Sequence, residues 1–295
     1  MRNMKPVSAL MLGLLSGCSL IPAYHRPALP VQNAYPVGGG GSGPAAADLG
    51  WKDFFKDPAL QQLISLSLAN NRNFRETALN VQQAQAQYRV DRASLFPTIE
   101  GDAYQSVTHT PANLSSAGRA ITSHEYSLGA QAVSWEIDLF GKLRSTAKSA
   151  HETFLSDLDT ALSTQISLVA QVASEYDTWL ADRQSLRISQ NTAAADQKSL
   201  SLVQLELNNG TVTAQDLAQA QITYDTAAAS VAQYQRQVAQ DMDELVLLAG
   251  APIPPALLAQ MNAVDGLDAE APLPHVPAGL PSDLLTPVSY THLTL

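Results

Sequence analysis

The segment from Lys142 to Asn209 contains neither glycine nor proline. Proline breaks helices and glycine weakens them, so an uninterrupted run of this kind favours one continuous helix. At about 1.5 Å per residue such a helix would be roughly 100 Å long. Because an ordinary globular core does not need a rod of that length, this run restricts the chain to a mainly helical, elongated architecture.

Apolar residues recur along this segment at heptad spacing, although Gln165 interrupts them. Toward the C-terminal end of the segment the apolar stripe thins, because Arg183 and three glutamines alternate with its apolar members. We interpret the apolar members as packing positions rather than as a ligand site. They are Leu155, Leu158, Leu162, Val169, Val172, Tyr176 and Trp179.

A helix stop and a new helix start follow the long run. Asn209-Gly210 is typical of a helix end, since glycine adopts the left-handed conformation without a steric penalty. Thr213 and Asp216 have the spacing of a capping box, with aspartate in place of the usual glutamate. A second run without glycine or proline extends from Thr211 to Ala249. The sequence therefore predicts a long antiparallel helical hairpin over residues 139–250, with its tip near Gly210.

Shorter elements are predicted upstream of the hairpin. Asp57-Pro58 resembles an N-cap followed by proline at the first helical position, and it opens a helical region that we assign to residues 51–97. A polar break at Asn70-Asn71 divides this region into two helices. Alternating patterns then predict two strands within residues 98–138, at Thr98–Thr110 and Tyr126–Ile137. The apolar face of the second strand changes sides near Ala132, which indicates a bulge or a change of environment.

The N-terminus has the pattern of a lipoprotein signal. Two basic residues precede an apolar run from Val7 to Leu15, and Leu15-Ser16-Gly17-Cys18 follows at once. We predict that residues 1–17 are a signal peptide and that Cys18 carries lipid; the alternative is an ordinary secretory signal with an incidental cysteine. Residues 18–50 are rich in glycine, proline and alanine, and we interpret them as a lipid-anchored flexible tether.

Composition excludes several classes of function. Cys18 has no second cysteine to pair with, so the sequence contains neither an intrachain disulfide nor a thiolate metal site. The formal net charge is −10, which argues against nucleic-acid binding. His151-Glu152 does not continue into a metalloprotease motif, and the chain has no nucleophile elbow, phosphate loop or dinucleotide fingerprint. We therefore expect no metal, no cofactor and no enzymatic activity.

The order of the predicted elements is tether, helix pair, strand pair and long hairpin. This order, together with the segment Ser134–Arg144, resembles the TolC-like outer-membrane factors of tripartite efflux pumps. Within it the family signature comprises Trp135, Glu136, Asp138, Leu139, Phe140, Gly141 and Arg144, for which we favour packing and capping roles over channel-specific ones. Supporting matches are Tyr24–Pro27, Trp51–Phe55, Ala93–Pro97 and Leu280–Leu285.

The resemblance implies a TolC-like fold in which this chain supplies two transmembrane β-barrel strands and one α-barrel hairpin. It implies a homotrimeric channel in the outer membrane, lipid-anchored, with most of the chain in the periplasm. The implied partners are outer-membrane lipid, a periplasmic adaptor (membrane fusion protein) and an inner-membrane pump. The hairpin tip, Asn209, Gly210, Thr211, Val212 and Thr213, aligns with the region that meets the adaptor in this family, although a bare turn would have a similar sequence.

A family subunit has two such repeats, whereas this sequence has one. We therefore expect residues 251–285 to lead toward a second repeat that is missing and residues 286–295 to be an unrelated tail. The predicted function is passive export of drugs or other small molecules, here by an incomplete fragment. The alternatives are a structural or adaptor-type periplasmic lipoprotein and, with no catalytic residues to support it, a lipid-anchored hydrolase.

Overall fold

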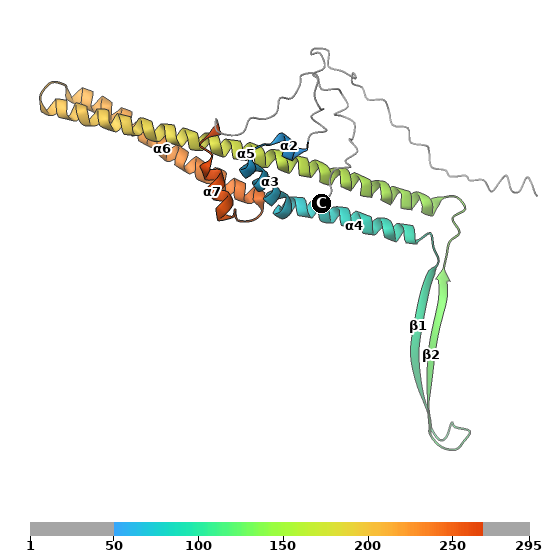
Figure 1. The fold of residues 1–295 in the computed structure, drawn as a ribbon. Helices are drawn as coiled ribbons and strands as arrows, with labels where there is room; N and C mark the ends of the chain where they lie inside the picture. Colours follow the sequence, from blue (N-terminus) through green and yellow to red (C-terminus); the bar gives the residue numbers. More distant parts are fainter. Residues whose placement is uncertain (1–49, 268–295) are drawn as a thin grey trace, which may run out of the picture. The chain divides into compact units, whose positions relative to one another are not determined.

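The computed structural model describes residues 50–267 (Figure 1). The predicted signal peptide, Cys18, nearly all of the tether, the end of the linker and the tail at 286–295 lie outside the described residues. The chain divides into two compact units. The described part of unit 1 comprises Leu79–Thr160, and that of unit 2 comprises residues 50–78 and 161–267.

Three helices precede the strands: α2 (Trp51–Phe54), α3 (Pro58–Asn70) and α4 (Arg72–Ala93). The Asp57 carboxylate accepts a hydrogen bond from the Ala59 N–H at 2.7 Å, which confirms the predicted N-cap. Asn71 separates α3 from α4, as predicted. Its side chain accepts a hydrogen bond from the Phe74 N–H at 3.0 Å and donates one to the Leu248 carbonyl at 2.9 Å.

The two strands, β1 (Thr98–Thr110) and β2 (Ile121–Ser134), form an antiparallel pair. The bounds of β1 agree with the prediction. The predicted bounds of β2 were wrong at both ends, because pairing with β1 extends the strand back to Ile121, opposite Thr110, and ends it at Ser134. The register shifts where Thr98 pairs with Ser134 and Ile99 with Ala132, which is the irregularity that the change of face near Ala132 predicted.

The long run forms a single helix, α5 (Lys142–Asn208), which is followed by α6 (Ala214–Ala249). Both the predicted helical hairpin and the capping box are present: the Thr213 side chain accepts from the Asp216 N–H, and the Asp216 carboxylate accepts from the Thr213 N–H. Within unit 2 the two helices run side by side from the turn that joins them (Figure 1). A further helix, α7 (Pro255–Ala263), lies in the segment predicted to be a linker.

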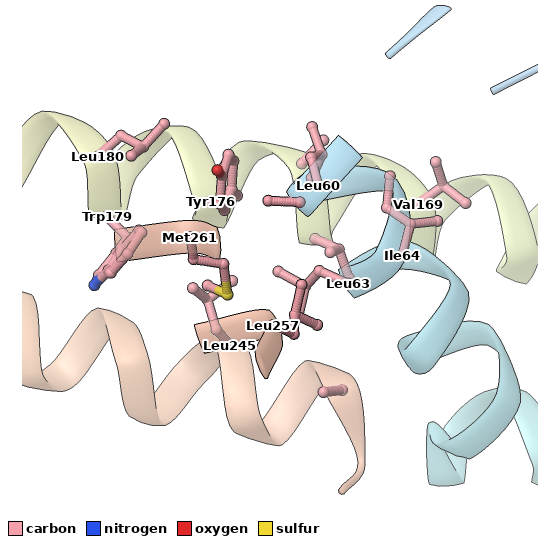
Figure 2. Packing of buried hydrophobic residues seen from close by; sticks show 14 of the residues in the cluster. Leu60, Leu63, Ile64, Val169, Tyr176, Trp179, Leu180, Leu245, Leu257 and Met261 are labelled. Atoms are coloured by element: carbon pink, nitrogen blue, oxygen red, sulfur yellow. The ribbon is translucent and has the colours of Figure 1, made fainter. Parts of the chain in front are cut away.

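The hydrophobic core lies where α3, α6 and α7 pack against the middle of α5 (Figure 2). Leu60, Leu63 and Ile64 of α3 are completely buried there. Burial of side chains of this size stabilises a fold by about 1.5–3 kcal/mol each. The other members are Ala59, Leu168, Val169, Val172, Ala173, Tyr176, Trp179, Leu180, Leu245, Ala249, Leu257 and Met261.

Polar contacts fix the elements around this core. The Tyr176 hydroxyl donates to the Asp57 carboxylate at 2.8 Å, so the residue that caps α3 is also tied to α5. Arg183 of α5 donates to the carbonyls of Met261, Asn262 and Val264 at the end of α7, while its guanidinium lies 4.5 Å from the ring centre of Trp179. The Met261 carbonyl also accepts from the Val264 N–H at 3.3 Å. The last carbonyls of a helix lack partners in a following turn, so Arg183 satisfies the C-terminal end of α7.

The predicted heptad stripe of α5 is buried in only one part. Val169, Val172, Tyr176 and Trp179 are buried in the core of unit 2. In unit 1, Leu155 and Leu158 remain 39% and 41% exposed. The preceding helix α4 likewise contributes no buried residue.

Two glycines with positive φ provide a matched test of packing. Gly250 caps α6 at φ 67°, and an added Cβ would lie 2.5 Å from the Asn70 carbonyl oxygen. Gly210 has φ 75° with nothing within 4 Å of the same position. We expect Gly210→Ala to lower the free energy of unfolding by about 1–2 kcal/mol through backbone strain alone. Gly250→Ala should cost about 1–3 kcal/mol more because of the clash, as measured by denaturant unfolding. Equal losses for the two variants would contradict the packing of α6 against the α3–α4 junction.

Candidate functional site

The strand pair has one apolar and one polar face. Directly opposed residues of an antiparallel pair share a face, so Ile99, Ala103 and Val107 of β1 lie on the same side as Tyr126, Leu128 and Ala132 of β2. Ile99 and Leu128 are 75% and 88% exposed. An apolar face this accessible is suited to contact with an apolar environment rather than with water.

The opposite face of the pair carries polar and acidic side chains. Glu100 pairs with Gln131, and Ser106 pairs with Glu125. Asp102 lies over Gly129, where an added Cβ would approach its carboxylate to 2.8 Å. The two faces therefore differ in polarity, although Tyr104 and Ile121 also lie on the polar one. In the described part of the chain, the sheet has two strands and two open edges.

Hydrogen-bonded polar groups lie on the apolar face toward the β1–β2 turn. The Gln105 amide donates to the Tyr126 hydroxyl at 3.2 Å, and His109 Nδ1 lies 2.9 Å from the hydroxyl oxygen of its pairing partner Thr122. Sequence alternation alone did not identify these hydrogen-bonded pairs, because the partners come from two strands. The register of β1 against β2 would have been needed to identify them.

The signature segment leads from β2 into α5 and holds a compact ion pair. The Asp138 carboxylate accepts from the Arg144 backbone N–H at 3.0 Å and from its Nε at 3.2 Å, while Arg144 Nη2 donates to the Asp138 carbonyl at 3.1 Å. Gly141 is buried at φ 79° directly before α5. These contacts close a loop whose geometry determines where α5 begins.

The aromatic residues of the signature are exposed. Trp135 donates its indole N–H to the Leu95 carbonyl at 3.2 Å yet remains 56% exposed. Leu139 and Phe140 are 65% and 72% exposed, and Glu136 is exposed as well. The structure thus brings Trp135 to the end of the preceding helical segment but leaves the apolar signature residues uncovered within the described chain.

The hairpin tip is a tightly hydrogen-bonded turn. The Gly210 N–H donates to the Leu207 carbonyl at 2.9 Å and the Thr211 N–H to the Glu206 carbonyl at 3.0 Å, which is a Schellman motif. Hydrogen bonds from the side chain and backbone of Thr213 hold the pKa of Asp216 below its ordinary value. Asn209, Gly210, Thr211 and Thr213 are exposed and Val212 is half-buried, so the tip presents a small, well-defined surface.

Two further observations concern the described residues as a whole. No helix within residues 50–267 has both the length and the apolar character needed to cross a membrane. In the same part of the chain, the structure brings together no three His, Cys, Asp or Glu side chains in a manner suited to a metal ion. Cys18, the predicted lipidation site, lies outside the described residues.

Comparison with known proteins gives a consistent set of matches. Residues 63–251, more than half of the chain, match the family model described as outer membrane efflux protein. The chain is 42% identical over 284 residues to the toluene efflux pump outer membrane protein TtgC of Pseudomonas putida, which covers 95% of this chain and 57% of TtgC. It is 33% identical over 246 residues to the outer membrane protein OprJ of Pseudomonas aeruginosa, covering 83% of this chain and 51% of OprJ.

The fold also resembles solved structures. The open-state MtrE outer membrane channel of Neisseria gonorrhoeae aligns with a TM-score of 0.70 and 28% identity, covering 89% of this chain and 57% of MtrE. The chain therefore spans little more than half of the length of the proteins that it matches.

The Asp138–Arg144 contact provides a test of how the signature loop is held. Asp138→Ala removes the acceptor of two Arg144 hydrogen bonds, whereas Glu136→Ala, two residues earlier, removes an exposed carboxylate. We expect Asp138→Ala to increase amide hydrogen exchange markedly over residues 135–145 and Glu136→Ala to leave it near the wild-type rate. Similar exchange in both variants would show that the carboxylate of Asp138 does not hold the loop.

Proposed function

Because the chain belongs to the outer membrane efflux protein family, we propose that it forms part of the outer-membrane channel of a tripartite efflux pump. The channel is a passive conduit for drugs or other small molecules, and the same family membership makes the chain a non-enzymatic protein. The observation that carries the proposal is the strand pair with one apolar and one polar face, joined directly to a helix of 67 residues.

The strand pair lies in the outer membrane in this proposal. β1 and β2 have 13 and 14 residues, more than the roughly 9–11 that a tilted membrane strand requires. The face with Ile99 and Leu128 contacts lipid, and the face with Glu100 and Glu125 lines the interior. Backbone groups at an open strand edge have no water to bond with in hydrocarbon, so further strands pair with both edges and close a β-barrel.

The helices continue the conduit on the periplasmic side. Leu155, Leu158 and Ile166 of α5 are 39–53% exposed, and further exposed apolar residues follow along the hairpin. Helices of neighbouring copies in a homotrimer cover this surface, because Leu155 and Leu158 belong to the predicted heptad stripe and apolar side chains at that spacing form helix–helix seams. This packing places the hairpins side by side around a central passage.

The partners follow from the same arrangement. The tip residues 209–213 contact a periplasmic adaptor, which connects the channel to an inner-membrane pump. Support for this comes from the exposed, hydrogen-bonded turn at Gly210 and Thr213, whose fixed geometry suits a repeated contact in a symmetric assembly. Toluene and antibiotics are candidate cargoes, since relatives at 42% identity are named for their efflux.

Lipid at Cys18 anchors the chain to the outer membrane. The thiol is the attachment atom, so Cys18→Ser should abolish lipidation and the cleavage before residue 18. Intact-mass measurement of the purified protein tests this: the wild type should begin at Cys18 with the added mass of acyl chains, and the variant should lack them. An uncleaved, unmodified wild-type N-terminus would exclude the anchor.

A chimera with TtgC tests the channel function, because it also contains the part of TtgC that this chain does not span. In it, this chain replaces the aligned part of TtgC, and a Pseudomonas putida strain without TtgC receives the chimera. We expect restored toluene tolerance, and we expect Leu128→Lys in the chimera to abolish it, because a lysine on the lipid-facing side at mid-membrane costs about 2–4 kcal/mol.

Ser127→Lys is the matched control, since Ser127 is adjacent to Leu128 and lies on the polar face. It should retain most of the tolerance. Equal loss with both lysines would contradict the assignment of the faces. A correctly inserted, trimeric chimera that gives no tolerance would contradict the efflux function itself.

A further inference from the structure

The side of the strand pair that carries Ile99 and Leu128 changes character along its length. Near the ends that join the helices it is apolar and exposed. Toward the β1–β2 turn, the same side carries polar side chains from both strands: Gln105, His109, Thr122, His124 and Tyr126. Polar groups are costly in hydrocarbon, so this end of the side is not suited to contact with acyl chains.

Contacts between the strands hold both histidines. Gln105 Nε2 lies 3.5 Å from His124 Nδ1 and donates to the Tyr126 hydroxyl at 3.2 Å. An amide nitrogen is only a donor, so His124 Nδ1 accepts and the ring proton is on Nε2, which can donate to an acceptor outside the chain. His109 Nδ1 lies 2.9 Å from Thr122 Oγ1. Each imidazole is therefore held through Nδ1 by a residue of the other strand.

The charged residues of the pair are segregated between its two sides. The carboxylates of β1 and β2 all lie on the side opposite the histidines: Glu100, Asp102 and Glu125. Arg119, the only lysine or arginine between Thr98 and Ser134, is exposed in the turn next to the histidine end. The side with the histidines thus combines N–H donors with a nearby cation and has no carboxylate. Such a surface is complementary to an anion.

The depth of these groups in the membrane rests on the function proposed above, with Leu128 at mid-membrane. A strand rises about 3.3 Å per residue, which is about 2.5 Å of height when it is tilted by about 40°. Half of an apolar band about 25 Å tall therefore ends about five residues from Leu128. His124 and Thr122 are four and six residues from Leu128 toward the turn. Because both strands join the periplasmic helices at their other ends, the histidines lie at the level of the outer headgroups.

We propose that the polar end of this side binds the phosphate groups of glycolipids in the outer leaflet of the outer membrane. His109 and His124 donate to phosphate oxygens, and Arg119 contributes its positive charge from the turn. The adjoining apolar part, with Leu128, contacts the acyl chains of the same lipid. One lipid molecule therefore contacts both parts of the side, and the contact fixes the depth of the strand pair in the membrane.

The probes for this site are phosphorylated lipid A and the same lipid without its phosphates, and native mass spectrometry of the full chain in detergent measures their binding. We expect the phosphorylated lipid to bind at least about tenfold more tightly, since hydrogen bonds to charged groups are the stronger ones. His124→Glu places a carboxylate on this side and should weaken binding of the phosphorylated lipid by about tenfold. Ser123→Glu is the matched control, because it adds the same charge at an exposed position on the opposite side. It should bind like the wild type.

Equal affinity for the lipid with and without phosphates would overturn the proposal, as would equal weakening by the two glutamates. Binding of phosphatidylglycerol as tight as that of phosphorylated lipid A would exclude the glycolipid as the preferred partner. His109→Ala removes a donor without adding charge, so it provides a second variant if His124→Glu does not fold, and it should also weaken binding.

The TtgC chimera separates this proposal from the efflux function. A chimera that restores tolerance but binds the phosphorylated lipid equally with and without His124→Glu would overturn the lipid site alone. A correctly inserted, trimeric chimera without tolerance would contradict the efflux function.

Discussion

A helix of 67 residues cannot stabilise itself by local hydrogen bonds, because most helix stability in proteins comes from tertiary packing of an apolar face. In this chain, packing is concentrated on the stretch from Leu168 to Leu180, where α3, α6 and α7 contact α5. The cap of α3 depends on it through Tyr176 and Asp57, and the end of α7 depends on it through Arg183. Elements far apart in sequence are thus fixed by one short part of the long helix.

Outside this core, the described chain has unpaired strand edges and exposed apolar surfaces. β1 and β2 each leave one strand edge open, and apolar residues of α5 outside the core remain exposed. Exposed edges and stripes of this kind are covered by lipid, by further strands and by other helices in the proposed channel. Among the described residues, the buried apolar side chains gather in one core cluster.

The buried polar groups of the described chain differ in how completely they are hydrogen-bonded. Asp57 and Asn71 have hydrogen-bond donors and acceptors that match them, so they fix the ends of helices. Asp241 is equally buried, yet its Oδ2 has no donor among the residues that the structure describes. Retaining a buried carboxylate without a full set of donors costs stability.

The sequence by itself determined the elements that depend on neighbouring residues. The long helix, the Asp57 and Thr213 caps, the break at Asn71 and the strand alternation could all be predicted, because each is set within a few residues of chain. Tertiary structure alone decided the start of β2 at Ile121, the docking of α7 in a region that resembled a linker, and the contacts of Trp135, Arg183 and Asp241. These depend on register and on partners 40 to 81 residues away, which local periodicity does not encode.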